Sequence, residues 1–394
     1  MQRLTKRIYS VGVNDTDKVL FEGLWPLPYG VSYNSYLVVD EKIALIDTVE
    51  SGFEEDFLYN IREAIGDRPV DYLVVNHMEP DHSSLISYMM ERYPELLIVA
   101  NAKTVPMLKG YYGVAEEDVL VMPEGGELSL GTCALKFHMI PMVHWPETMV
   151  TYDTTDQILF SCDAFGSFGT LDGGIFDDTV NFDFYEEDMR RYYSNIVGKW
   201  SNMVQKAFAK LDGVPVKIIC PSHGIIWRKD PSKVLSLYDK WSKHEAEEGV
   251  VIIYASMYGN TEKFAEEIAR KISEQGVRDI RVFDVSKTHV SYLLSAIWKY
   301  KGLILGSCAY NTDMHPMMAL LTHEISVSDP KNKVLGIFGG SSWNSSGSKA
   351  LRAFAEKMKM DVVGDNAEFL GRPFASDMEQ LDAFAKEFVA QLRK

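Results

Sequence analysis

The chain after Gly249 alternates regularly between strand-like and helix-like segments, and this alternation restricts the possible folds more than any other feature of the sequence. Runs rich in β-branched residues predict strands, whereas apolar residues at three- and four-residue spacing predict amphipathic helices. The pattern predicts strands at 250–255, 281–285, 303–306, 333–338 and near 361–370, and helices at 261–276, 290–299, 317–325, 349–360 and 377–392. Such alternation is typical of a doubly wound α/β domain. We therefore expect a five-stranded parallel sheet with helices on both faces.

The chain before this region has a different character, with many short strands and fewer helices between them. Strands are predicted at 35–40, 43–47, 71–75, 97–100, 134–139, 157–160 and 216–220, and helices at 53–65 and 85–93. This mixture predicts an α+β domain. The charged segment 240–249 ends in glycine, which is typical of a helix that runs into an interdomain linker. We therefore expect two domains, residues 1–247 and 248–394.

Composition and charge exclude several classes of partner. The 394 residues carry 40 Lys and Arg against 56 Asp and Glu, and the net charge of −16 disfavours nucleic acid and anionic membranes. No apolar run approaches the roughly 18 residues that a membrane helix needs. The four cysteines form no C-x-x-C pair, which argues against a disulfide scaffold, a zinc ribbon or an attached rubredoxin module. We expect a soluble, cytoplasmic protein with reduced thiols.

Candidate metal ligands follow the ends of apolar segments in the first domain. They are His77, Glu79, Asp81, His82, His144, Asp163 and His223. The first four occur within six residues directly after the predicted strand at 71–75, and the others each follow a later apolar run, at 140–143, 158–162 and 218–222, that we expect to be a strand. Strand ends can meet at one sheet edge, and burying these groups together without a cation would be costly. The set therefore predicts a metal site.

The donor set restricts the metal. Three carboxylates and four imidazoles, with no ligating thiolate nearby, favour iron or manganese over a zinc site built on cysteine. Seven ligands also exceed the roughly four that a single zinc ion takes. Two metal ions bridged by one carboxylate are the most economical arrangement.

The spacing His77-x-Glu79-x-Asp81-His82, followed by His144, Asp163 and His223, resembles the metallo-β-lactamase-fold site of the flavodiiron proteins, also called A-type flavoproteins. In that variant Glu replaces the second His of the usual H-x-H-x-D-H motif. The flanking segments 143–149 and 221–227 match the family as well. The resemblance implies an αββα sandwich for the first domain.

The resemblance also implies a role for each ligand. One iron would be bound by His77, Glu79 and His144, and the other by Asp81, His223 and His82, with Asp163 as the bridge. At the position of His82 the family uses either the histidine or water. Asp163 and His82 are the residues that we expect to be catalytic.

Three loops at predicted strand ends form a candidate flavin site in the second domain. Their residues are Ser256, Met257, Tyr258, Gly259, Asn260 and Thr261, then Ser307, Cys308, Ala309, Tyr310 and Asn311, and finally Gly340, Ser341, Ser342, Trp343 and Asn344. Hydroxyl groups and backbone N–H groups at a helix N-terminus suit a phosphate. Neither G-x-x-x-x-G-K-[ST] nor G-x-G-x-x-G occurs there, which disfavours ATP and NAD. Trp343 is placed to stack on a planar ring. The loops resemble those of flavodoxin, which implies FMN.

Together the two resemblances imply an oxidoreductase with FMN and two irons per chain that reduces O2 to water, NO to N2O, or both, as protection against oxygen or nitrosative stress. They further imply a rubredoxin-type electron donor. The expected assembly is a head-to-tail homodimer, or a dimer of such dimers, with the FMN of one subunit beside the irons of the other.

Two other classes of function stay open from the sequence. One is a metallo-β-lactamase-type zinc hydrolase with a flavodoxin domain, which Glu79 disfavours. The other is a flavoprotein electron carrier or redox sensor with an inactive metal site. Trp145, Tyr192 and Tyr193 are candidates for the wall of a substrate pocket, with aromatic core packing as the alternative.

Overall fold

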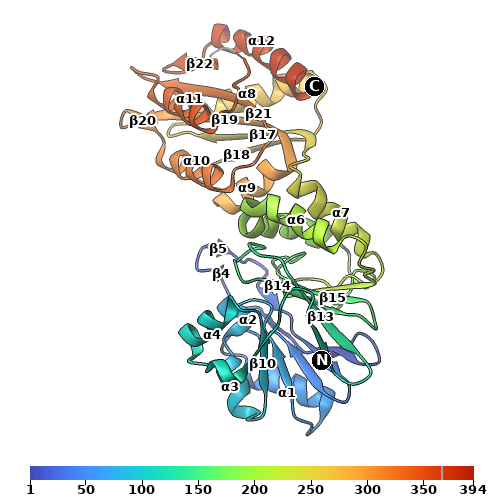
Figure 1. Cartoon of the computed structure of the whole chain (residues 1–394). Helices are drawn as coiled ribbons and strands as arrows, with labels where there is room; N and C mark the ends of the chain where they lie inside the picture. The colour runs from blue at the N-terminus through green and yellow to red at the C-terminus, as the bar shows by residue number, and fades with distance from the viewer. Residues whose placement is uncertain (365–366) are drawn as a thin grey trace. The chain divides into compact units, whose positions relative to one another are not determined.

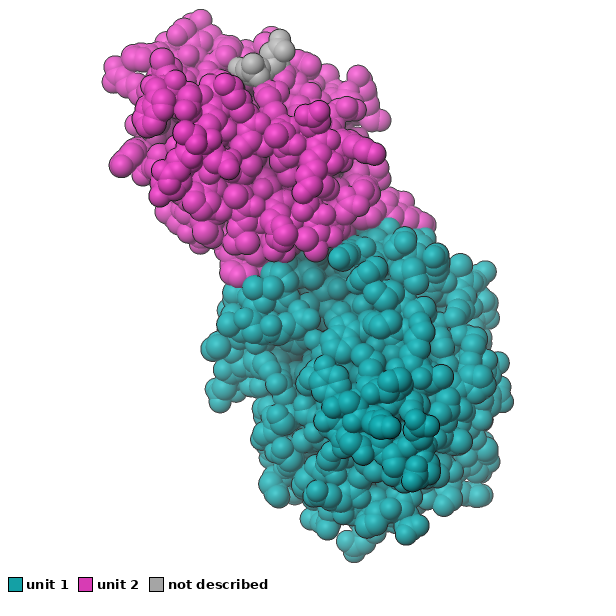
Figure 2. Space-filling model, turned by 60° about the vertical axis from the view of Figure 1, so that its left-hand side comes forward, with its two compact units in different colours: residues 1–242 teal, residues 243–394 magenta. Residues whose placement is uncertain are grey.

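The computed structural model describes residues 1–364 and 367–394, and its contacts divide the chain into two compact units (Figures 1 and 2). The units are Met1–Ser242 and Lys243–Lys394. Helix α7 (Pro231–Ser242) ends the first unit, and strand β17 (Glu247–Ala255) is the first regular element of the second. The boundary predicted at residue 247 falls on the first residue of β17, five residues beyond this division (247 − 242).

Two sheets form the framework of the first unit. Within the described residues, the larger has seven strands in the order β1 (Gln2–Arg3), β2 (Ile8–Ser10), β7 (Tyr36–Val39), β8 (Ile43–Ile46), β9 (Tyr72–Val74), β10 (Leu97–Ala100) and β11 (Val119–Val121). The smaller has five, β12 (Glu127–Ser129), β13 (Ala134–Met139), β14 (Met149–Asp153), β15 (Ile158–Cys162) and β16 (Ile218–Pro221). Strands β8, β14 and β15 are buried along their whole length, and β8 is accordingly apolar throughout.

Helices and two short hairpin-like pairs complete this unit. The helices are α1 (Glu54–Ile65), α2 (Pro80–Ser83), α3 (Ile86–Arg92), α4 (Thr104–Tyr112), α5 (Asp183–Tyr192), α6 (Ser201–Leu211) and α7, with short 3₁₀ or π turns at 116–118, 193–197 and 198–200. The paired strands are β3 (Val13–Asp15) with β6 (Val31–Tyr33), and β4 (Leu20–Phe21) with β5 (Trp25–Pro26). Helix α1 shows why such segments fold as they do: its first turn is acidic, and Phe57, Leu58, Ile61 and Ile65 form one buried face.

The second unit contains the predicted parallel sheet. Among the described residues, five strands run parallel in the order β18 (Ile280–Asp284), β17, β19 (Tyr300–Tyr310), β21 (Val334–Ser341) and β22 (Ala367–Leu370). A short strand, β20 (Asp313–Met314), pairs antiparallel with the end of β19. The helices are α8 (Asn260–Glu274), α9 (Val290–Lys299), α10 (Pro316–Ser328), α11 (Ser346–Met358) and α12 (Ala375–Leu392). In this order β17, the first strand of the unit along the chain, lies second from one edge of the sheet, as in one of the two common doubly wound folds.

The structure confirms the predicted fold class, an α+β domain followed by a doubly wound α/β domain. One predicted strand was wrong, because β13 ends at Met139 and residues 140–143 form a turn; Pro141 in this segment has no N–H to donate to a sheet. The last predicted strand, near 361–370, is β22, and residues 365–366 of that segment lie outside the described part. In the part of the chain that the structure describes, no helix is both long and apolar enough to cross a membrane.

The core of the second unit depends on one close approach between neighbouring strands. Gly306 of β19 pairs in register with Phe338 of β21, and a Cβ atom at Gly306 would lie 2.0 Å from Phe338 Cζ. The Phe338 ring is fully buried, with its centroid 6.1 Å from that of Phe264. Only glycine leaves room for this ring.

We therefore expect Gly306→Ala to lower the free energy of unfolding by about 1–3 kcal/mol, because the added methyl group overpacks the core. Urea denaturation followed by circular dichroism measures the change. The control is Gly110→Ala in α4, where an added Cβ meets no atom within 4 Å. There the gain in helix propensity should raise stability by up to about 1 kcal/mol. An unchanged transition in Gly306→Ala would show that the Phe338 ring can move aside.

Candidate metal centre and flavin cradle

The predicted metal ligands converge where strands of both sheets in the first unit end. His77 and Glu79 follow β9, and Asp81 and His82 lie in the adjoining helix α2. The remaining three are His144 between β13 and β14, Asp163 directly after β15, and His223 just beyond β16. All seven side chains are buried. The structure therefore brings together every residue that the sequence predicted for this site.

Four of these side chains form one cluster around the second oxygen of Asp163. Its Oδ2 lies 3.3 Å from His77 Nε2 and 3.2 Å from His144 Nε2. Glu79 Oε2 completes the cluster at 3.3 Å from His77 Nε2 and 3.0 Å from His144 Nε2. The candidate ligand atoms lie within 4.8 Å of one another.

The other three side chains gather on the first oxygen of the same carboxylate. Asp163 Oδ1 lies 3.0 Å from His82 Nε2 and 3.5 Å from His223 Nε2. Asp81 Oδ2 is 3.5 Å from His82 Nε2 and 3.2 Å from His223 Nε2. Asp163 thus presents one oxygen to each cluster.

The electrostatics of the site favour bound cations. Burial alone lowers the pKa of the His144 imidazole, but hydrogen bonds with the carboxylates of Asp163 and Glu79 raise it to about 10. Burial alone would raise the pKa of Asp163, but His82, His144 and His77 hold it well below its usual range. Without metal the carboxylates therefore hold protons on the imidazoles. A metal cation supplies the same positive charge in place of those protons.

Several polar atoms in the site lack hydrogen-bond partners, although they are buried. They include both carboxylate oxygens of Asp81 and the Nε2 atom of His223. The other ring nitrogen of His223, Nδ1, donates to the carbonyl of Ser32 at 2.7 Å, which leaves the Nε2 lone pair directed into the site. Converging lone pairs without donors fit two bound metal ions and do not fit an ordinary hydrogen-bonded core.

The flavin cradle lies at the carboxyl ends of the strands of the second unit. A pocket of about 70 Å³ there is lined by ten of the predicted residues, Ser256, Met257, Tyr258, Asn260, Thr261, Cys308, Ala309, Gly340, Ser341 and Ser342. Gly259 has a φ of 83° and donates its N–H to Ser256 Oγ, so that the loop turns sharply into the N-terminus of α8. The cradle fits a phosphate held by backbone N–H groups and hydroxyls.

The other predicted residues of these loops lie around the pocket and do not line it. They are Gly259, Ser307, Tyr310, Asn311, Trp343 and Asn344. Trp343 is 84% exposed, so packing within this unit does not account for its position. Burial raises the pKa of the Cys308 thiol, which favours an inert cysteine over a reactive one.

Comparisons with known proteins find relatives for both units of the chain. Residues 31–224 match the ODP family beta lactamase domain, and residues 252–383 match flavodoxin. The anaerobic nitric oxide reductase flavorubredoxin of Escherichia coli is 34% identical over 342 residues, which is 86% of this chain and 71% of that protein. The structure of the Giardia intestinalis flavodiiron protein superimposes with a TM-score of 0.92 at 25% identity, over 100% of this chain and 97% of that one. The chain belongs to the flavodiiron protein family.

A second solved structure resembles this flavodiiron protein over its whole length. It is the rubredoxin oxygen:oxidoreductase of Desulfovibrio gigas, with a TM-score of 0.95, 29% identity, and coverage of 100% of this chain and 98% of that one. The family takes its name from a flavin and a diiron centre. The present chain has a buried site that fits two metal ions and a cradle that fits a flavin phosphate.

Two residues that support the metal ligands were missed by the sequence analysis. Glu147 accepts a hydrogen bond from His77 Nδ1 at 2.7 Å and from the N–H of Met78 at 3.0 Å. Asp47, after β8, accepts from the N–H of Asn76 at 2.7 Å. Both carboxylates hold the loop that carries His77 and Glu79. The segment 143–149 was singled out by its resemblance to the family, but nothing local indicated that Glu147 contacts His77.

The sequence analysis also missed the pair β4–β5, whose side chains cover the metal site. The Phe21 ring lies 5.4 Å from the His223 ring, and Arg191 holds the pair in place by donating to the carbonyl of Pro26. Tyr192, one of the candidates for a pocket wall, lies 5.6 Å from the His223 ring. Tyr193 packs away from the site, against Tyr238 and Trp241.

A pair of substitutions distinguishes a shared ligand from a single one. Asp163→Ala should remove both metal ions, because it deletes the carboxylate that faces both clusters. His82→Ala should affect one metal ion and reduce activity by about 10–100-fold, because water can replace a single ligand. Metal analysis of both purified variants measures the difference. Equal and mild losses in the two variants would contradict a bridging role for Asp163.

Proposed function

We propose that this chain takes electrons through FMN and reduces O2 to water, NO to N2O, or both, at a diiron site. The observation that carries the proposal is the position of Asp163, between two clusters of buried carboxylates and imidazoles. Relatives with each activity support it: the Escherichia coli relative is named a nitric oxide reductase, and the Desulfovibrio gigas relative an oxygen:oxidoreductase that uses rubredoxin.

The comparisons do not favour the two alternatives that the sequence left open. A zinc hydrolase of the same fold is disfavoured because Glu79 supplies an anionic oxygen donor beside His77 and His144. An electron carrier with an inactive metal site is disfavoured because the ligand set is complete and buried. The proposed physiological role is protection against oxygen or nitrosative stress.

We assign one iron to His77, Glu79 and His144, and the other to Asp81, His82 and His223. Asp163 would hold the two ions close enough to act on one substrate. When bound there, FMN would supply one- and two-electron transfer, and a ferrous pair would supply the binding and reduction of a small diatomic molecule. The residues of the three flavin loops would hold the phosphate and the ring.

Aromatic side chains would shape the space above the metal ions. Trp145 lies 5.1 Å from the His77 ring, and Phe21 and Tyr192 lie beside His223. The Tyr192 hydroxyl is buried and has no hydrogen-bond partner among the described residues. It is therefore available to donate a hydrogen bond to a ligand of the metal ions, whereas the surrounding rings exclude bulk water.

Exposed apolar side chains at both sites support a head-to-tail dimer, or a dimer of such dimers. Tyr258 is 90% exposed and Trp343 84% exposed beside the flavin cradle. Leu24 is 50% exposed in the β4–β5 segment that covers the metal site. Exposed apolar groups of this kind mark interaction surfaces. In the proposed dimer, the exposed side chains beside the flavin cradle of one subunit would contact those over the metal site of the other. This contact would bring the FMN of one subunit to the irons of its partner. A rubredoxin-type donor would reduce the FMN.

The proposal is tested by anaerobic turnover of the purified, cofactor-loaded protein with pre-reduced rubredoxin or an artificial donor, in parallel runs with O2 and NO. We expect about one FMN and two irons per chain, by the ligand count, and consumption of at least one of the gases. Active protein that contains zinc alone, or no flavin, would contradict the proposal.

Replacing Glu79 tests the choice between reductase and hydrolase. Glu79→His should shift the metal content from iron toward zinc and abolish reduction of O2 and NO, because an imidazole removes the anionic oxygen donor. FMN content should not change, since the cradle lies in the other unit. Glu79→Asp is the matched control, because it keeps an anionic oxygen donor at this position and should retain iron. Retention of two irons and near wild-type turnover in Glu79→His would show that this residue does not select the metal.

A further inference from the structure

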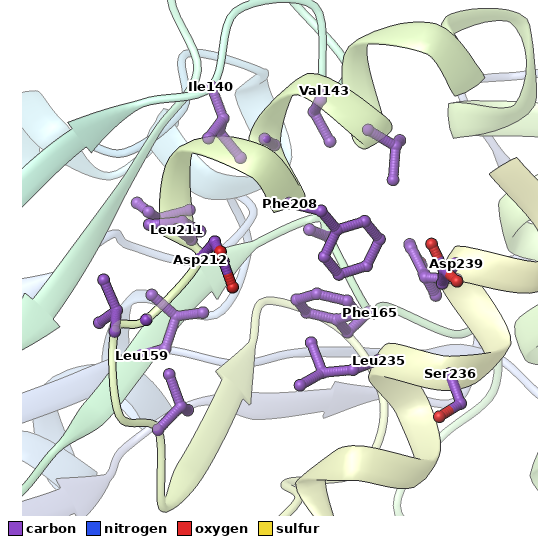
Figure 3. Close-up of a pocket in the computed structure, with 18 residues that line it drawn as sticks. Ile140, Val143, Leu159, Phe165, Phe208, Leu211, Asp212, Leu235, Ser236 and Asp239 are labelled. Atoms are coloured by element: carbon purple, nitrogen blue, oxygen red, sulfur yellow. The ribbon is translucent and has the colours of Figure 1, made fainter.

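A second, apolar pocket lies in the first unit beside the metal site. Its volume is about 480 Å³. One wall is the face of the smaller sheet, with Val150 of β14 and Leu159 of β15, and the opposite wall is formed by α6 and α7 (Figure 3). The proposed function does not use this pocket.

Helix α6 presents a complete apolar face to this pocket. Val204, Ala207, Phe208 and Leu211 follow the three- and four-residue spacing of one helix face, and all four line the pocket. The face nevertheless does not close onto the sheet, since Phe208 and Leu211 remain only half-buried. Figure 3 shows the rings of Phe165 and Phe208 together in the middle of the pocket, with centroids 6.3 Å apart.

The inner end of the pocket is formed by the direct chain neighbours of two proposed iron ligands. Val143 precedes His144, and Ala164 follows Asp163. These two wall residues are 2% and 7% exposed, so this end is closed to solvent. Phe165 has a φ of 71°, which is unfavourable for a residue with a side chain, and its ring packs 4.7 Å from the Tyr238 ring. The turn that places the carboxylate of Asp163 therefore also places an aromatic ring in the wall of the pocket.

The chemistry of the walls restricts the occupant. Water is poorly held in a space with so few polar partners, whereas apolar cavities bind uncharged apolar atoms and molecules. The carboxylates of Asp212 and Asp239 lie at the two sides of the pocket and would repel the carboxylate or phosphate of a lipid (Figure 3). An uncharged diatomic gas needs no hydrogen bond and is not repelled.

We propose that this pocket binds the diatomic gas that the chain reduces and supplies it to the metal site through the side formed by Val143, Ala164 and Phe165. The inference rests on the proposed function for the identity of the gas. The binding of an apolar gas in the pocket does not depend on it.

Xenon is the probe for the binding step. Crystals of the full, cofactor-loaded chain pressurised with xenon should show it between Phe208 and Ala164. Ala207→Phe fills the pocket from α6 and should displace the xenon. Ala209→Phe is the matched control, because Ala209 lies on the same helix, is exposed and does not line the pocket. Xenon should remain bound in this control.

Kinetics test the supply step. Ala207→Phe should lower kcat/KM for O2 or NO several-fold, with unchanged kcat at saturating gas and unchanged iron and FMN contents, whereas Ala209→Phe should match the wild type. Leu235→Trp fills the pocket from α7 and must give the same result, which keeps the test decisive if Ala207→Phe does not fold.

Three results would overturn the inference. They are an absence of xenon from the wild-type pocket, displacement of xenon without a change in kcat/KM, and an organic extract that contains a larger apolar molecule bound there. If the wild type reduces neither gas, the proposed function fails, and the xenon experiment still decides whether the pocket binds an apolar gas.

Discussion

The carboxylate of Asp163 is the group on which the organisation of the metal site depends. It is completely buried, and each of its oxygens faces a separate pair of imidazoles. A buried carboxylate is stable only beside compensating positive charge. The ends of β9, β15 and β16 meet at one place in the fold. This brings the imidazoles, and any metal ions that they bind, next to the carboxylate. The backbone at Cys162 and Phe165 takes positive φ angles, 54° and 71°, to turn the chain around this residue.

The flavin cradle solves a different physical problem. A phosphate needs N–H donors more than it needs side-chain cations, and the turn at Gly259 supplies a helix N-terminus for that purpose. Because the backbone supplies these donors, the three loops can bind a phosphate without Lys or Arg, and none of them contains either residue. The chain as a whole is acidic, with a net charge of −16. The two sites lie in separate compact units, each with its own core, so each can be understood from its own sheet.

Much of both sites could be predicted from the sequence because strand ends carry the chemistry. His77 to His82 follow β9 directly. The first predicted flavin segment follows β17, whereas the other two begin within the last residues of β19 and β21, which extend further than predicted. Where the local pattern was weaker, prediction failed. The segment 140–143 was apolar but contained Pro141, and β13 ended before it. Phe369 and Gly371 line the flavin pocket at the end of β22, but no glycine- and hydroxyl-rich loop marked that position.

The sequence by itself determined the fold classes of the two domains through their periodicity. It also supplied the candidate metal ligands and flavin-binding residues, through their positions at predicted strand ends and their resemblance to a known family. Only the tertiary structure decided that each oxygen of Asp163 faces one of the two sets of candidate ligands, and that Glu147 holds His77. It also decided that β4–β5 covers the site and that α6 leaves an apolar pocket beside it. The physical reason is that these contacts join side chains far apart in the chain, and their distances depend on how the sheets and helices pack.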